Sequence, residues 1–263
     1  MDLGTSGQVY LAAAATSGLG KGIARALASD GARVWIGSRD TDVVGRVADE
    51  MASETGSQVG GSPLDVTDPS SISSWVASAL SEHQRIDGLL VNAGGPPVGG
   101  FESFTDLDWQ MAFELTLMST IRLIREVLPT MKRQKSGSIL VITSSSIKEP
   151  IDILLLSNVM RSAVANLVKS LSREFAPLGI RVNSIIPGRI ATPRVRALDK
   201  TAAGRAGKTA DEIRRESEAS IPLGRYGTTD EFGRVGAFIL SPAASYVTGE
   251  MVTVDGGAMK GVW

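Results

Sequence analysis

The feature that most constrains the fold is a regular alternation of short apolar segments with longer segments of helical periodicity. Helical patterns cover residues 18–29, 40–55, 69–83, 106–134, 153–176 and 229–240. Between and around them lie short apolar runs at 9–15, 32–37, 59–64, 86–91, 137–143, 180–186 and 251–254. Continuous apolar runs are typical of strands buried on both faces, and a helix between successive strands favours parallel pairing. The sequence therefore predicts one α/β domain over residues 1–263, doubly wound around a seven-stranded parallel sheet.

Composition and charge exclude several functional classes. The 263 residues are 43% hydrophobic and 21% charged, and this length suits a single α/β sheet domain. The absence of cysteine excludes disulfides, thiolate metal sites and a cysteine nucleophile, and the only histidine, His83, is expected at the surface. We therefore expect no metal site and no Ser–His–Asp triad.

The expected environment follows from the same features. A net charge of −1 argues against a nucleic-acid partner. No apolar run is long enough to span a bilayer, so no membrane association is expected. The first residues lack a basic segment followed by an apolar one, and we expect a cytoplasmic protein.

Residues 192–220 depart from the alternation, because they are polar and charge-rich and contain no strand pattern. A long segment of this kind after a strand is often a mobile substrate lid, and the alternative is a plain pair of surface helices. Arg189 and Arg194 stand where this segment begins, and their guanidiniums could bind a carboxylate or phosphate of a ligand or remain solvated.

A glycine-containing turn joins the first predicted strand to the first helix. Glycine at such a turn lets the backbone approach a pyrophosphate and aim its N–H groups at it, next to the helix amino terminus. The spacing matches a GxxxGxG pattern in which alanine replaces the first glycine. The predicted phosphate-binding residues are Ala14, Thr16, Ser17, Gly18, Leu19 and Gly20.

The end of the second strand bears on the type of dinucleotide. NAD sites place an acidic residue there to accept from the ribose hydroxyls. This chain has Ser38 and Arg39, and a guanidinium can pair with a 2′-phosphate. The pair favours NADP(H), while Asp40 could still act as the acid and leaves NAD(H) open.

Further motifs follow the later strands: Leu64-Asp65-Val66, Asn92-Ala93-Gly94, Pro187-Gly188, Tyr246-Val247-Thr248-Gly249 and Val254-Asp255-Gly256-Gly257. In order and spacing these motifs resemble the short-chain dehydrogenase/reductase family from end to end, especially its 3-oxoacyl-[acyl-carrier-protein] reductases. The resemblance implies a Rossmann-type fold. It also implies that Asp65 and Val66 hold the adenine, that Asn92, Ala93 and Gly94 lie along the adenosine ribose, and that Pro187, Gly188, Ile190 and Thr192 hold the nicotinamide.

The same resemblance implies four catalytic positions, and three of them carry an unusual residue. Ser144 matches the family's serine, whereas Ser157 stands at the tyrosine, Arg161 at the ribose-binding lysine and Thr116 at the asparagine. A serine hydroxyl is far less acidic than a tyrosine, and an arginine does not shuttle protons. Ser144, Ser157 and Arg161 therefore suit holding an oxyanion more than protonating it.

A substitute acid and several reactions remain open at this point. Lys148, four residues after Ser144, could donate the proton if burial beside Arg161 makes it more acidic, or it could be an ordinary surface lysine. Ser145 and Ser146 could bind the substrate oxygen or cap a loop. The reaction would be NADP(H)-dependent reduction of a carbonyl, as in 3-oxoacyl reductases, or of a conjugated enone, with a small molecule as substrate.

The alternative function is a cofactor-binding sensor or an inactive subunit that pairs with an active relative. The resemblance, the apolar face of residues 106–134 and the segment 246–257 favour a homo-oligomer, and a tetramer in particular.

Overall fold

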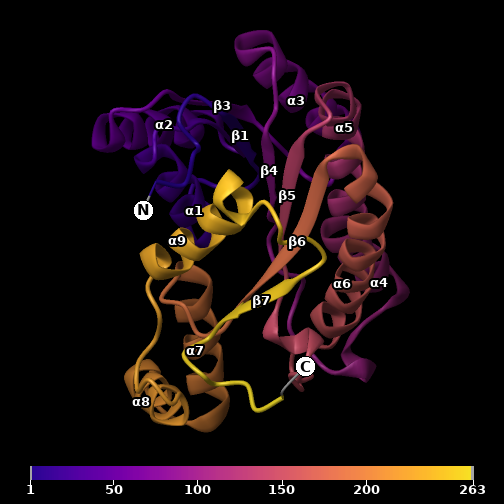
Figure 1. The fold of residues 1–263 in the computed structure, drawn as a ribbon. Coiled ribbons are helices and arrows are strands. Elements are labelled where there is room, and N and C mark those ends of the chain that lie inside the picture. Colours follow the sequence, from indigo (N-terminus) through magenta and orange to yellow (C-terminus); the bar gives the residue numbers. More distant parts are fainter. Residues whose placement is uncertain (1, 262–263) are drawn as a thin grey trace.

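The computed structural model describes residues 2–261, and its centre is one seven-stranded sheet (Figure 1). All neighbouring strands pair in parallel, in the order β3-β2-β1-β4-β5-β6-β7. The predicted doubly wound, Rossmann-type α/β fold is confirmed. The strands are β1 (Val9–Ala12), β2 (Arg33–Ser38), β3 (Val59–Pro63), β4 (Gly88–Val91), β5 (Gly137–Ile142), β6 (Ile180–Pro187) and β7 (Met251–Val254).

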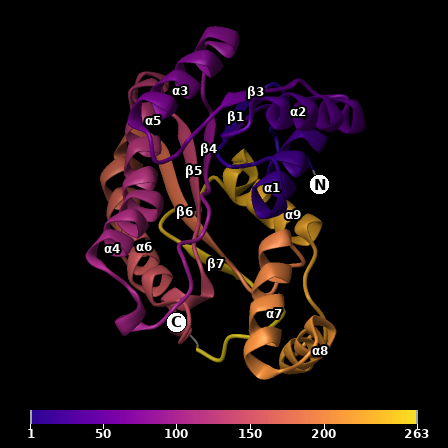
Figure 2. The same ribbon diagram turned by 180° about the vertical axis from the view of Figure 1, so that it is seen from behind.

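Helices cover both faces of this sheet, as Figures 1 and 2 show from opposite sides. One buried cluster joins the sheet to α3, α5 and α6, and a second joins it to α1, α2 and α9. The apolar residues of the central strands are buried on both faces, which explains their continuous apolar runs. The helices are α1 (Gly18–Ser29), α2 (Thr41–Thr55), α3 (Pro69–His83), α4 (Asp106–Phe113), α5 (Ser119–Gln134), α6 (Leu155–Phe175), α7 (Pro193–Ala206), α8 (Ala210–Ser220) and α9 (Thr229–Leu240).

The prediction of a single helix at 106–134 is wrong in one respect. A π-helical turn at Glu114–Met118 separates α4 from α5. The hydroxyls of Ser119 and Thr120 donate to the carbonyl oxygens of Leu115 and Thr116, at 2.6 and 2.8 Å, and satisfy backbone groups at this irregularity. Apolar periodicity missed it, because the apolar residues continue on both sides of the turn.

His83 is not the surface residue that was expected. It is partly buried at the end of α3, with its ring edge-on to Trp35 at 5.8 Å between centroids. Burial lowers the pKa of His83, so the ring is largely neutral at pH 7.

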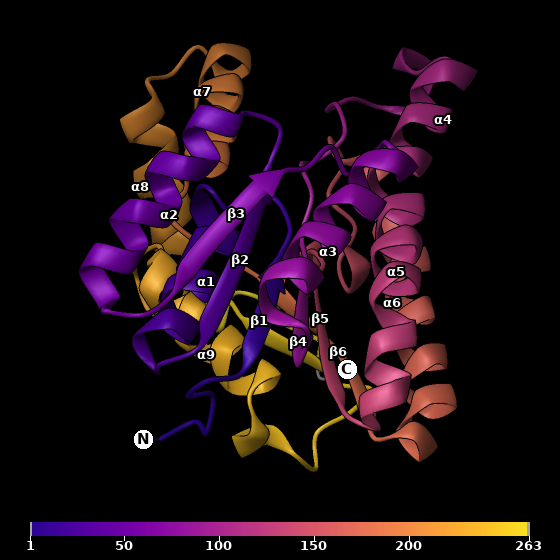
Figure 3. The same ribbon diagram turned by 90° about the horizontal axis from the view of Figure 1, so that it is seen from above.

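The segment 192–220 folds into α7 and α8, which stand together at one end of the molecule (Figure 3). A buried carboxylate holds the first of these helices in place. Asp199, 3% exposed, accepts from Arg189 Nη1 at 2.6 Å and from the Tyr226 hydroxyl at 3.1 Å. The structure thus contains the pair of surface helices that was one of the two predictions for residues 192–220. The movement of this pair as a lid stays a prediction.

Candidate active site

A cavity of about 1110 Å³ opens along the carboxyl ends of the strands. Parallel pairing brings these ends to the same edge of the sheet, so segments that are distant in sequence meet there. Most of the predicted cofactor and catalytic residues line this cavity together. They are Ala14, Thr16, Ser17, Gly18, Leu19, Ser38, Arg39, Asp65, Val66, Asn92, Ala93, Gly94, Ser144, Ser157, Arg161, Pro187, Gly188, Ile190 and Thr192.

The turn between β1 and α1 has the backbone geometry that favours glycine. Gly18 lies at φ 57° and Ala14 at φ 48°, both in the left-handed region. An alanine pays a conformational penalty there that glycine does not. Asn92 at the end of β4 donates its amide to the Ala14 carbonyl at 2.9 Å and holds the strained turn in place.

Gly20 does not line the cavity, and the structure gives it a packing role. A Cβ atom at this position would lie 2.9 Å from the Asn92 amide nitrogen and 3.0 Å from the Ala14 carbonyl oxygen. Gly20 therefore allows close packing beneath the turn. Its contact with the cofactor stays a prediction.

Arg39 and Asp40 are the two candidates for contacting the adenosine ribose, and their side chains differ in the partners that they have. The Asp40 carboxylate caps α2 and accepts from the Val43 N–H at 3.1 Å. Arg39 is exposed at the cavity edge and forms no ion pair within residues 2–261. Asp65 is held ionised, because the hydroxyl and N–H of Thr67 donate to it and lower the pKa of its carboxyl.

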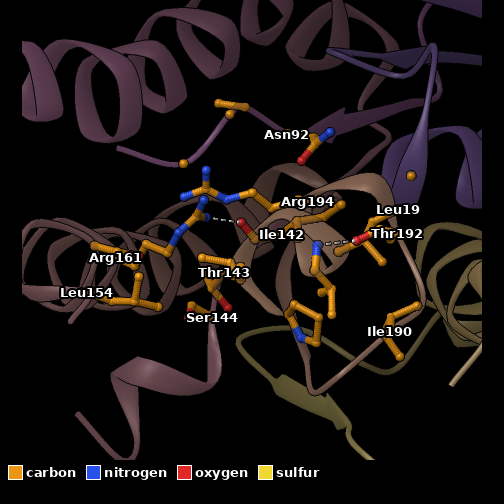
Figure 4. A pocket seen from close by; sticks show the side chains of 18 of the residues that line it. Leu19, Asn92, Ile142, Thr143, Ser144, Leu154, Arg161, Ile190, Thr192 and Arg194 are labelled. Carbon is orange, nitrogen blue, oxygen red and sulfur yellow. Dashed lines mark hydrogen bonds between the residues drawn. The ribbon is translucent and has the colours of Figure 1, made fainter. Parts of the chain in front are cut away.

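At the other end of the cavity, Ser144 and Arg161 lie around one space (Figure 4). Ser157 lines the same cavity. The Ser144 oxygen accepts from the Ser146 N–H at 3.1 Å, which leaves the Ser144 O–H free to donate to a ligand. Arg161 Nη1 donates to the Ile142 carbonyl at 2.9 Å, at the end of β5. Burial, and then the neighbouring Arg194, lower the pKa of Arg161 to about 10, so it is still a cation at pH 7.

Two predicted catalytic residues are not brought to this cavity. The Lys148 ammonium lies at the Thr253 hydroxyl, 3.4 Å away, so its side chain is directed to β7. Thr116 is buried in the π-helical turn, and its neighbour Leu115 lines the cavity instead. The geometry supports neither residue as a group that touches the substrate.

Sequence reasoning missed the part of the wall that comes from the end of the chain. Asp255, Ala258 and Met259 line the cavity, and the Glu149 carboxylate fixes this segment by accepting from the Lys260 N–H at 2.9 Å. Nothing in the sequence around these residues signals the contact, which depends on β7 pairing beside β6. Other unexpected lining residues are Leu115, Pro150, Ile151, Ile153, Leu154, Leu198 and Ala202.

Known proteins with the same architecture settle the family. A family model described as enoyl-(acyl carrier protein) reductase matches residues 13–259. The chain belongs to the short-chain dehydrogenase/reductase family. It is 32% identical, over 96% of its length and 97% of the relative's, to a Streptomyces virginiae protein named for a ketoacyl reductase of the monensin polyketide synthase.

Two solved structures extend the comparison. L-sorbose reductase from Gluconobacter frateurii, complexed with NADPH and L-sorbose, superposes with a TM-score of 0.94 at 29% identity over the whole of both chains. An NADPH-bound short chain oxidoreductase from Pseudomonas aeruginosa, described as containing an atypical catalytic center, gives 0.87 at 28% identity, covering 97% of this chain and 98% of that one. The short-chain dehydrogenase/reductase described here is thus an NAD(P)-dependent oxidoreductase of the 3-oxoacyl-reductase-like kind.

Residues 2–261 offer neither a membrane-spanning helix nor a metal cluster. None of their helices combines the length and apolarity needed to cross a bilayer. Over the same residues, no group of three or more His, Cys, Asp or Glu side chains is arranged to hold a metal ion.

The strain at Ala14 gives a testable prediction. Ala14→Gly should raise the free energy of unfolding by about 1 kcal/mol, because it removes a left-handed alanine. Urea denaturation measures the change, and Ala13→Gly is the matched control. Ala13 is buried and its φ is not positive, so that change should destabilise the protein. Equal destabilisation by both substitutions would contradict strain at Ala14.

Proposed function

We propose that this protein is an NADP(H)-dependent reductase that adds hydride to a carbonyl compound conjugated with a carbon–carbon double bond. One observation carries the proposal. Among residues 2–261, no tyrosine, histidine, lysine or cysteine lines the cavity. The product best suited to such a site is an enolate, which is much less basic than an alkoxide and needs no acid from the protein.

The choice of NADP(H) rests on Arg39 and Asp40. Arg39 stands at the end of β2 with its guanidinium unpaired among the described residues, while Asp40 is engaged in capping α2. The positive-φ turn and the amino terminus of α1 fit a pyrophosphate, since the Ser17 cap makes no side-chain hydrogen bond with the first turn. The two solved structures reported above contain NADPH, which also favours NADP(H) over NAD(H) for this protein.

The chain's own residues would hold the reacting oxygen. NADPH, when bound, supplies the hydride, which forms a bond to the β-carbon as the double bond shifts towards the oxygen. Ser144 donates its free O–H to the developing oxyanion, and the Arg161 cation stabilises its charge. Water protonates the α-carbon, so NADPH, one proton and the enone give NADP⁺ and the saturated carbonyl compound.

Direct carbonyl reduction is the second candidate, because the relatives carry names of ketoacyl and L-sorbose reductases. In that reaction Ser144 and Arg161 would hold an alkoxide until solvent protonates it. The third candidate is a cofactor-binding sensor or an inactive subunit. Such a protein would bind NADPH without turning over a substrate.

The lid at residues 192–220 is part of the proposal. Leu198 and Ala202 of α7 line the cavity, so a movement of this helix would change the space for the substrate. The buried Asp199 carboxylate is the anchor of α7, through Arg189 and Tyr226.

Cofactor preference is tested at Arg39. Arg39→Ala should weaken NADPH binding by about 1–3 kcal/mol and leave NADH binding nearly unchanged, since only NADPH carries the 2′-phosphate. Fluorescence titration with both cofactors measures this. Arg46→Ala, which removes another exposed arginine nearby on α2, is the control. Equal losses for both cofactors would refute the phosphate role.

The proton route is tested by restoring the family's residues. Ser157→Tyr with Arg161→Lys should raise the rate for ketones, because it returns an acid, and should not help enones. Arg161→Met or Ser144→Ala alone should slow enone reduction about 100- to 1000-fold, as loss of one preorganised donor does. NADPH oxidation with matched ketones and enones is the measurement.

In the unmodified protein, kcat/KM for an enone should be flat from pH 6 to 9 and fall as the pH approaches 10, where Arg161 loses its charge. An inflection near neutrality that disappears in Lys148→Met would instead identify Lys148 as the acid. Cofactor binding with no oxidation by any compound would favour the sensor.

We also propose that the protein is a homo-oligomer, and a tetramer in particular. Three large apolar side chains near α4 are strongly exposed in the single chain: Phe101 at 75%, Leu107 at 63% and Met111 at 59%. Exposed apolar clusters of this kind mark association surfaces. Light scattering at micromolar concentration should give the mass of four chains, and Leu107→Asp should reduce it. A monomer at that concentration would contradict the proposal.

A further inference from the structure

Two arginine side chains from different helices meet in the catalytic part of the cavity. Arg161 reaches it from α6, and Arg194 reaches it from the first turn of α7. Figure 4 shows their guanidinium groups side by side. The influence of Arg194 on the protonation of Arg161 agrees with this closeness. The cavity therefore holds two positive charges next to Ser144 and Ser157.

Each guanidinium is held by neutral carbonyl oxygens. Arg161 Nη1 donates to the Ile142 carbonyl at 2.9 Å, and Arg194 Nη2 donates to the Pro96 carbonyl at 3.3 Å. Gly95 makes room for this second contact, because a Cβ atom there would lie 3.0 Å from Arg194 Nη2. These bonds orient the two guanidiniums in the cavity and leave other N–H groups free to donate.

No carboxylate of residues 2–261 neutralises either arginine. The acidic side chains of the cavity wall have other partners. Asp65 accepts from Thr67, Glu149 from the Lys260 N–H, and Asp255 from two N–H groups of the segment that follows it.

Arg189 shows the contrast. It also lines the cavity, but its guanidinium pairs with the buried Asp199 at 2.6 Å. Of the two arginines that open the segment 192–220, only Arg194 is therefore available to a ligand.

The phosphates of the cofactor do not account for this pair. In the proposed function, the pyrophosphate lies at the turn formed by Ser17 and Gly18, and the 2′-phosphate lies at Arg39. In Figure 4, the paired guanidiniums lie away from Leu19 and beside Ile142 and Ser144. The anion that they would bind is thus part of the substrate.

We propose that the substrate carries a carboxylate close to its reacting carbonyl, and that Arg194 binds this carboxylate beside Arg161. The planar fork of a guanidinium matches the two oxygens of a carboxylate, and a substrate with adjacent carbonyl and carboxylate oxygens matches two adjacent forks. Arg194 is then a specificity-determining residue, and its place on α7 links anion binding to the position of that helix. The inference rests on the proposed function and narrows its substrate class to oxo acids whose carbonyl is conjugated with a carbon–carbon double bond.

The test compares two acids with their uncharged esters. The probes are trans-4-phenyl-2-oxobut-3-enoate, a conjugated 2-oxo acid, and pyruvate, each beside its methyl ester. Calorimetric titration into the protein saturated with NADP⁺ measures binding without turnover. At least one acid should bind about 10-fold or more tightly than its ester. Arg194→Met should weaken the binding of that acid about 10- to 100-fold and change the Kd of the ester by less than about 3-fold.

Three controls make the test specific. Arg196→Met removes the same charge from an exposed position of α7 that does not line the cavity, and it should leave the affinity unchanged. Arg194→Lys should keep part of the preference, because it retains the charge without the fork. The Kd for NADPH, measured by fluorescence, should change by less than about 3-fold in Arg194→Met.

Several results would overturn the inference. One is that neither acid binds more tightly than its ester, and another is that Arg194→Met weakens acid and ester equally. A loss of NADPH affinity of about 10-fold in Arg194→Met would assign this arginine to the cofactor phosphates instead. Selective acid binding without NADPH oxidation by the conjugated acid would refute the proposed reaction and leave the anion site standing.

Discussion

The parallel pairing of seven strands is the constraint on which the rest of this structure depends. It brings the end of every strand to one edge, and the side chains that follow β1, β2, β4, β5 and β6 meet there without any local relation in sequence. The crossover helices that parallel pairing requires bury both faces of the sheet, so this edge, rather than a face, is left open for ligands. The cavity is thus a consequence of the topology, and its chemistry is decided by the residues at the strand ends.

Arg161 sets the electrostatics of the cavity at the end of β5. The guanidinium lies on the carbonyl of Ile142 at the end of β5 and stays charged at pH 7. A fixed cation beside Ser144 stabilises negative charge that develops on a substrate oxygen, whereas proton delivery would need a group that titrates near neutrality. In the proposed function, the serine at position 157 and the cation at position 161 are consistent with one another, since both favour an anion that water protonates.

The turn at Ala14 shows how the fold tolerates a departure from the glycine pattern. A left-handed alanine is unfavourable by itself, but the Asn92 amide bonds its carbonyl from the neighbouring strand. Strain is held by contacts that lie far away in sequence, and the amide that supplies the contact also stands on the cavity wall.

The sequence by itself determined the sheet, most helix positions and the identity of the residues at the strand ends. These depend on apolar periodicity and on short spacings such as the step of four from Ser157 to Arg161, which places both on one side of a helix. Only the tertiary structure decided which side chains meet across elements. Arg189 and Arg194 look alike in sequence, yet the first pairs with Asp199 while the second lies beside Arg161. Lys148 turns to Thr253, and the segment after β7 closes the cavity. Such contacts depend on the packing of whole helices and on side-chain direction, and local spacing contains no information about either.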